Sequence, residues 1–169
     1  ELRKYIFDKN RIVKRILLLG EYSLHGMINF KRTIEKTFMD LEVKDYDITY
    51  KPHPAFEFNF ESELEIKETN QNLNDILFTF DLVICTNSTS ASIDAILNGV
   101  KVFIFLDPNV LNLSPVLNMV KQNIFFHDSH ELKLLILGGL DTMETNVTDK
   151  FFNLGTDLHL WKNILKSLE

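Results

Sequence analysis

The chain has 169 residues, of which 45% are hydrophobic, and carries a formal net charge of −6. A chain of this length can bury a substantial core as one domain, but it is too short for two large ones. Its negative charge argues against a surface that binds nucleic acid. The single cysteine, Cys85, lies inside an apolar segment, so we expect no disulfide framework and a buried thiol in a reducing cytoplasm.

The first half of the chain alternates short apolar runs with amphipathic segments. Residues 15–20 form an apolar run that ends in glycine, which predicts a buried strand. Helical spacing of apolar residues predicts a helix over 27–41, and alternation predicts a strand over 46–50. We expect a short, partly exposed strand over 62–68 and a helix over 70–80, capped by an asparagine at 70 or 72.

The second half continues the same pattern. A buried strand over 81–87 precedes a helix over 88–99, which hydroxyl residues open and Gly99 closes. Another strand begins at Val100, and Ser114 with Pro115 predicts the start of a further helix. Residues 123–137 indicate a strand and a helix, and amphipathic spacing predicts a terminal helix within 151–169.

The sequence His-Asp-Ser-His-Glu at residues 127–131 could suggest a metal site. A capping box between Asp128 and Glu131, at the start of the helix that follows, explains it better. We therefore expect no metal there.

Strands that alternate with helices through short connections predict βαβ units and a mostly parallel sheet. We expect an α/β fold, a three-layer Rossmann-like domain over residues 15–169, with a lead-in over 1–14. In such sheets ligands bind outside the carboxyl ends of the strands, near the point where the strand order reverses.

Polar residues follow the carboxyl ends of two of these strands. Lys51 and His53 come after the strand at 46–50, and Ser88, Thr89 and Ser90 come after the strand at 81–87. Basic groups, hydroxyls and the unpaired N–H groups of a helix N-terminus suit a phosphate. No Walker sequence or G-x-G-x-x-G is present, so the usual nucleotide signatures are missing. Helix capping alone could also explain the hydroxyls, and His53 could be an ordinary loop residue.

His53-Pro54 after one strand, and Thr89-Ser90 at the start of the helix after a later one, resemble the HP and S/T-S motifs of bacterial GT-B glycosyltransferases. The resemblance is strongest to enzymes that use CMP-activated acidic sugars, the sialyltransferases and Kdo transferases of capsule and lipopolysaccharide assembly. Residues 86–105 also resemble the donor half of the glycerophosphotransferases of teichoic acid synthesis. The similarity covers roughly residues 15–165.

The resemblance implies roles for particular residues. His53 would be catalytic, bonding the donor phosphate and stabilising the leaving nucleotide. Thr89 and Ser90 would hold phosphate oxygens, Lys51 would neutralise phosphate charge, and Ser88 would be a neighbour of less certain role. Residues after other strand ends could form the donor loop: Gly20, Glu21, Asp107, Asn109 and Ser114.

Two further expectations concern carboxylates and cofactors. Asp94, one helical turn beyond the hydroxyl pair, would support it. Glu21 faces the right edge for a catalytic base, but it is equally a loop residue, and no base can be nominated. Inverting enzymes of this family generally need no metal, so we expect no cofactor beside the nucleotide-sugar donor.

A GT-B enzyme has two Rossmann-like domains, and this chain resembles the C-terminal, donor-binding one. We therefore expect it to bind nucleotide weakly and not to transfer sugar without an N-terminal, acceptor-binding domain. The acceptor would be a glycan or a lipid-linked molecule, and the protein would be cytoplasmic, with peripheral association at the inner membrane. Two alternatives stay open: a transferase of the CDP-glycerol type, and a non-catalytic Rossmann-like interaction module.

Overall fold

The computed structural model describes residues 14–41, 43–112, 114, 116, 124–138 and 166. In this part of the chain six strands form one sheet in the order β3-β2-β1-β4-β5-β6, and every pairing between neighbours is parallel. The strands are β1 (Lys14–Leu19), β2 (Tyr46–Lys51), β3 (Ile66–Glu68), β4 (Leu82–Thr86), β5 (Lys101–Phe105) and β6 (Phe125–Phe126). This is the Rossmann strand order, in which the chain leaves β1 in one direction and returns to its other side with β4.

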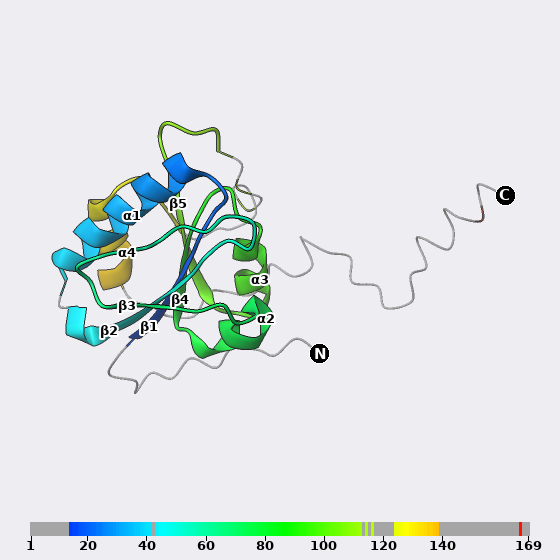
Figure 1. Cartoon of the computed structure of the whole chain (residues 1–169), viewed down its shortest axis with the longest axis horizontal. Helices are drawn as coiled ribbons and strands as arrows, with labels where there is room; N and C mark the ends of the chain where they lie inside the picture. The colour runs from blue at the N-terminus through cyan, green and yellow to red at the C-terminus, as the bar shows by residue number, and fades with distance from the viewer. Residues whose placement is uncertain are drawn as a thin grey trace.

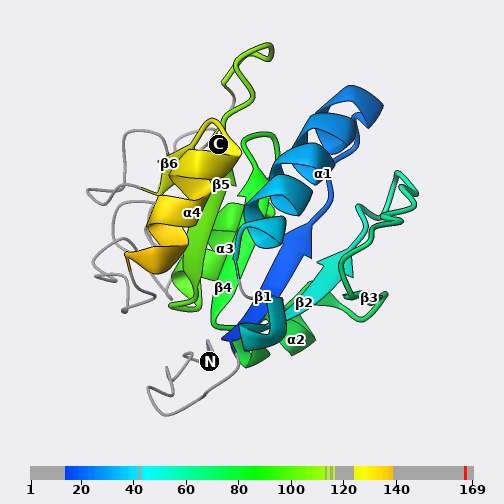
Figure 2. The same ribbon diagram turned by 90° about the vertical axis from the view of Figure 1, so that its left-hand side faces the viewer.

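Helices cover both faces of the sheet. The α-helices are α1 (Leu24–Met39), α2 (Leu73–Ile76), α3 (Ala91–Leu97) and α4 (Ser129–Leu137), and short 3-10 turns occupy Val43–Asp45 and Leu77–Thr79. Figures 1 and 2 show α1 and α4 on one face of the sheet and α2 and α3 on the other. The expected α/β, three-layer, Rossmann-like fold is therefore confirmed. Among the described residues no helix combines the length and the apolar character needed to cross a membrane.

The core consists of two clusters, one on each face of the sheet, because successive strand side chains point in opposite directions. In β1, Ile16 and Leu18 pack with α1, whereas Leu17 and Leu19 pack with α2 and α3. Every residue of β4 is buried, as expected for a central strand covered on both sides. Cys85 of β4 is fully buried and free, and burial raises the pKa of its thiol.

Two predicted helix boundaries are confirmed in detail. Gly99 follows α3 with a φ of 76° and donates its N–H to the carbonyl of Ile96, and the Val100 N–H bonds Ala95, which together end the helix in a Schellman motif. Asp128 is the N-cap of α4 and its carboxylate accepts the N–H of Glu131 at 2.9 Å, while the Glu131 carboxylate accepts the N–H of His127, one residue before the cap, in place of that of Asp128. These two ends fix where strands β5 and β6 enter and leave the sheet.

Two other elements are shorter in the structure than the sequence predicts. The strand expected over 62–68 covers only Ile66–Glu68, because the Ser62 hydroxyl accepts the N–H of Leu64 and turns the chain before it. The helix expected over 70–80 begins after its cap, Asn72, and its last turn is a 3-10 turn that ends before the extended Phe80.

Three other expectations cannot be compared with the fold. The helix after Ser114-Pro115, the terminal helix within 151–169 and most of the lead-in over 1–14 lie outside the described residues.

Candidate functional site

The parallel register brings four loops to one edge of the sheet. Leu19 pairs with both Lys51 and Cys85, so β1, β2 and β4 end together, and Thr86 pairs with Phe105 at the end of β5. The loops that begin at residues 20, 52, 87 and 106 therefore share this edge. The predicted candidates in these loops, from Gly20 to Asn109, lie on it.

Gly20 allows the loop after β1 to lie directly against the loop that carries His53. Its N–H donates to the carbonyl of Lys51 at 2.9 Å. A Cβ at this position would lie 2.8 Å from Tyr50 Oη and 3.0 Å from the His53 backbone nitrogen. Only glycine fits this approach without moving the backbone of the neighbouring loop.

Glu21 links the loop after β1 to the loop after β4. Its side chain is buried, with 6% of the residue exposed, and its carboxylate accepts the hydroxyl proton of Ser88 in a short hydrogen bond. Ser88 Oγ also lies 3.1 Å from Thr86 Oγ1, at the end of β4. The carboxylate occupies the space where a Cβ of Gly26, in the first turn of α1, would otherwise lie.

Asp107, in the loop after β5, is a buried residue at the centre of a second hydrogen-bonded group. It accepts the side-chain N–H of Asn29 at 2.7 Å, the backbone N–H of Asn109 at 2.8 Å and the Asn109 side chain at 3.1 Å. Burial by itself would raise the pKa of Asp107, but these hydrogen bonds and nearby His25 lower it below the ordinary value. Asn29 of α1 was missed by sequence reasoning, because nothing in the local pattern of a helix indicates which loop it faces.

His53 is held in one orientation. Its Nδ1 accepts the N–H of Ala55 at 3.1 Å, and the ring meets Tyr22 edge to face, with 6.1 Å between centroids. Because Nδ1 is an acceptor, we assign the ring proton to Nε2, whose N–H no described residue accepts.

Thr89 and Ser90 keep hydroxyl protons that no described residue accepts. Thr89 Oγ1 accepts the N–H of Ala91 at 3.3 Å, so its own proton is still available. Ser90 is the N-cap residue of α3, but its exposed hydroxyl forms no capping hydrogen bond. Capping of α3 therefore explains the acceptor side of the Thr89 hydroxyl but not its proton. It explains nothing about the Ser90 hydroxyl.

The side chains of three predicted site residues have no described bond to the other candidates. The half-buried Lys51 forms no ion pair with a described residue. Asp94 is an exposed residue, although partial burial raises the pKa of its carboxyl, and among described residues it has no hydrogen bond to Thr89 or Ser90. The Ser114 hydroxyl is buried without a described partner, and its neighbours in sequence, Leu113 and Pro115, lie outside the described residues.

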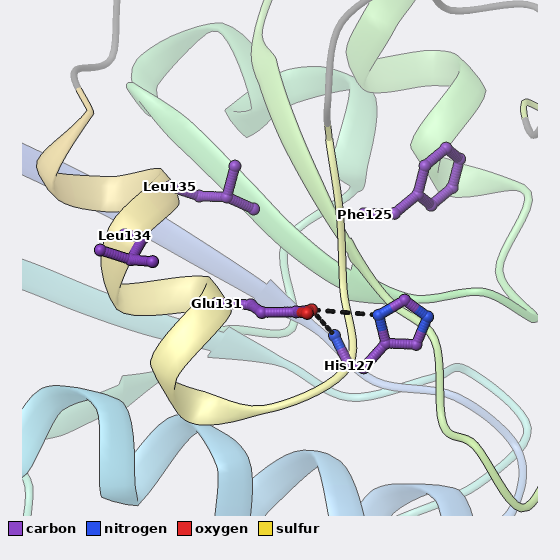
Figure 3. Close-up of a pocket in the computed structure, with 5 residues that line it drawn as sticks. All are labelled: Phe125, His127, Glu131, Leu134 and Leu135. Atoms are coloured by element: carbon purple, nitrogen blue, oxygen red, sulfur yellow. Dashed lines mark hydrogen bonds and ion pairs between the residues drawn. The ribbon is translucent and has the colours of Figure 1, made fainter.

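Two pockets lie beside this edge rather than at its centre. A pocket of about 330 Å³ is lined by Phe125, His127, Glu131, Leu134 and Leu135 and lies over β6 (Figure 3). There Glu131 accepts both the backbone N–H of His127 at 2.7 Å and its Nδ1 at 3.0 Å, so the acid–histidine pair belongs to the start of α4.

The second pocket, of about 230 Å³, adjoins the His53 loop and is lined by Pro52, Glu57, Phe58, Asn59, Glu68 and Asn70. Its two carboxylates disfavour a phosphate. Among the described residues no three His, Cys, Asp or Glu side chains are grouped in a way that could hold a metal ion.

No protein-family model matches the chain, and no curated protein matches it in sequence. One solved structure that it resembles is the crystal structure of the glycotransferase of kitacinnamycin, at 13% identity and a TM-score of 0.49. The match covers 82% of this chain and 38% of that one. A similarity this distant carries no inference about activity.

Proposed function

We propose that this chain is the donor-binding domain of a glycosyltransferase, and that His53, Thr89 and Ser90 bind the phosphate of a nucleotide sugar. The observation that carries the proposal is a set of donors at the carboxyl edge of the sheet that no described residue accepts: His53 Nε2–H after β2, and two hydroxyls after β4. Strands β2 and β4 flank β1, and ligands of Rossmann-like sheets bind at this reversal of strand order.

The chemistry required is the stabilisation of a leaving nucleotide. When the bond between sugar and phosphate breaks, negative charge develops on the phosphate oxygens, and preorganised donors stabilise it. Since Nδ1 of His53 accepts the Ala55 N–H, the ring would donate to the phosphate through Nε2. Lys51 adds positive charge nearby, and no metal ion is needed in this scheme.

The finer assignment follows from the HP and S/T-S motifs. We propose a CMP-activated acidic sugar as donor and a glycan or lipid-linked acceptor in bacterial surface polysaccharide synthesis, such as capsule or lipopolysaccharide. The enzyme would work in the cytoplasm, peripherally at the inner membrane. A second, acceptor-binding domain would complete the active site, so this chain alone would bind donor without transferring sugar.

Calorimetric titration of the chain with CMP, CDP, UDP and GDP tests this assignment. We expect CMP to bind best. We expect His53→Ala, and the pair Thr89→Ala with Ser90→Ala, to weaken binding roughly 10- to 100-fold, because hydrogen bonds to a charged group contribute about 1.5–3 kcal/mol. Two matched controls should leave binding unchanged: His130→Ala, an exposed histidine of α4, and Thr33→Ala, whose hydroxyl bonds its own helix.

Other results would redirect the assignment. Selective binding of UDP or GDP would exclude the acidic sugars. Preference for CDP, with cleavage of CDP-glycerol by the full-length protein, would favour a glycerophosphate transferase. If neither the folded chain nor the full-length protein bound a nucleotide, the proposal would be wrong and a non-catalytic interaction module would replace it.

A further inference from the structure

Ser88 differs from its two hydroxyl neighbours in where its proton goes. The Ser88 hydroxyl donates to Glu21 Oε2, and a serine has only one proton to donate. The hydrogen bond between Thr86 and Ser88 must therefore run from the Thr86 hydroxyl to Ser88 Oγ. Within this network Ser88 retains no proton for a ligand.

This arrangement is unsuited to a direct phosphate contact. Phosphate oxygens accept hydrogen bonds, so Ser88 could bind them only by releasing Glu21. That release would leave the carboxylate of Glu21, a residue only 6% exposed, without the Ser88 proton, and an unpaired buried charge is costly. The Glu21 carboxylate would also repel a phosphate placed at Ser88.

Glu21 also contacts α1, through both its carboxylate and its backbone N–H. The carboxylate fits only because Gly26 has no side chain, and the Glu21 backbone N–H contacts the Met27 sulfur at 3.2 Å. One buried side chain therefore joins the first turn of α1, the loop after β1 and the loop after β4. Thr89 and Ser90 belong to that last loop, directly after Ser88.

We propose that Glu21 and Ser88 are a positioning pair: their hydrogen bond fixes the loop over residues 86–90 so that the phosphate meets Thr89 and Ser90, not Ser88. The pair acts across the point where the strand order reverses. The inference rests on the proposed function for the ligand, but the bond between the two loops can be tested without any ligand.

The ligand-independent test is a double-mutant cycle in thermal unfolding of the full chain, with Ser88→Ala, Glu21→Ala and the double variant. We expect each single change to lower the Tm, and the double change to cost clearly less than the sum, because either single change already removes the bond. Additive effects would overturn the proposal, even for a chain that binds CMP.

The second test measures the dissociation constants of cytidine and CMP. The constant of cytidine divided by that of CMP gives the contribution of the phosphate to binding. Glu21→Asp keeps the charge but shortens the reach to Ser88, and Gly26→Ala displaces the carboxylate while leaving both residues in place. We expect each of these, like Ser88→Ala, to lower the ratio roughly three- to tenfold, because the loop loses its support.

A direct phosphate contact by Ser88 predicts a different pattern. Ser88→Ala would then lower the ratio of dissociation constants to about one. Glu21→Asp and Gly26→Ala free the Ser88 proton, so they would keep the ratio or raise it. That result would overturn the proposal. If the wild-type chain binds neither cytidine nor CMP, the proposed function fails, and the unfolding cycle alone decides whether the pair couples the loops.

Discussion

Two groups of polar side chains lie at the same edge of the sheet and satisfy their hydrogen bonds in opposite ways. One group, which we call the tied group, is mostly buried and bonded within itself: Glu21, Asn29, Thr86, Ser88 and Asp107. The other, the open group, keeps donors that no described residue accepts: His53, Thr89 and Ser90. Both groups follow the ends of parallel strands.

The difference separates structural polar groups from candidate ligand groups. A buried polar atom must form its hydrogen bonds within the protein, because water cannot reach it. An accessible donor can bond water until a ligand binds, at little cost in folding free energy. The motif of three consecutive hydroxyls does not make this distinction. Ser88 belongs to the tied group and its two neighbours to the open one, although all three are adjacent in sequence.

The largest effect that would break this comparison is expected at Gly20, where the loop after β1, which carries Glu21, lies against the loop that carries His53. Gly20→Ala should lower the free energy of unfolding by about 1–3 kcal/mol, because its Cβ would press on Tyr50 Oη and on the backbone of His53. It should also weaken CMP binding by displacing His53. Urea unfolding and calorimetry measure the two effects.

Gly138→Ala is the matched control for Gly20→Ala. Gly138 has a φ of −65°, which alanine adopts readily, and an added Cβ there would press on one atom only, the Leu134 carbonyl oxygen at 3.1 Å, so we expect a smaller loss than at Gly20. Equal losses in the two alanine variants would show that the close approach at Gly20 does not matter.

A smaller, pH-dependent effect is expected in the tied group at Asp107. Its pKa is lowered in the folded protein, so the ionised form stabilises the fold at neutral pH, and this contribution is lost as the pH falls below the ordinary aspartate value of about 4. Asp107→Asn should cost about 0.5–1.5 kcal/mol at pH 7 and progressively less below pH 4. Urea unfolding at several pH values measures it, and a cost that stays constant down to about pH 2 would contradict the assignment.

The smallest effect, of opposite sign, is expected at Asp94. Partial burial raises the pKa of its carboxyl, so its ionised form disfavours the fold above the ordinary aspartate value. Asp94→Asn should therefore slightly raise the free energy of unfolding at pH 7, and the gain should vanish in acid. If CMP binding fell as well, Asp94 would have the supporting role that its position suggests, despite the absence of a described contact with the hydroxyl pair.

Much of the fold could be predicted because its strands and helix ends depend on residues that are close together in the sequence. Alternation and apolar runs indicate the strands, and Gly99 and Asp128 indicate helix ends through the conformations and hydrogen bonds that these residue types favour. Strand-end polar residues such as His53 and Ser90 could be expected at one edge as soon as the sheet is taken to be parallel.

The tertiary structure alone decided which of these side chains form hydrogen bonds within the protein and which keep donors for a ligand. Ser88 meets Glu21 across 67 residues and Asp107 meets Asn29 across 78, and no spacing in the sequence announces either pair. Periodicity and capping act between near neighbours, so the sequence determines them by itself. The satisfaction of a buried carboxylate depends on which strands lie side by side, and that order exists only once the sheet has formed.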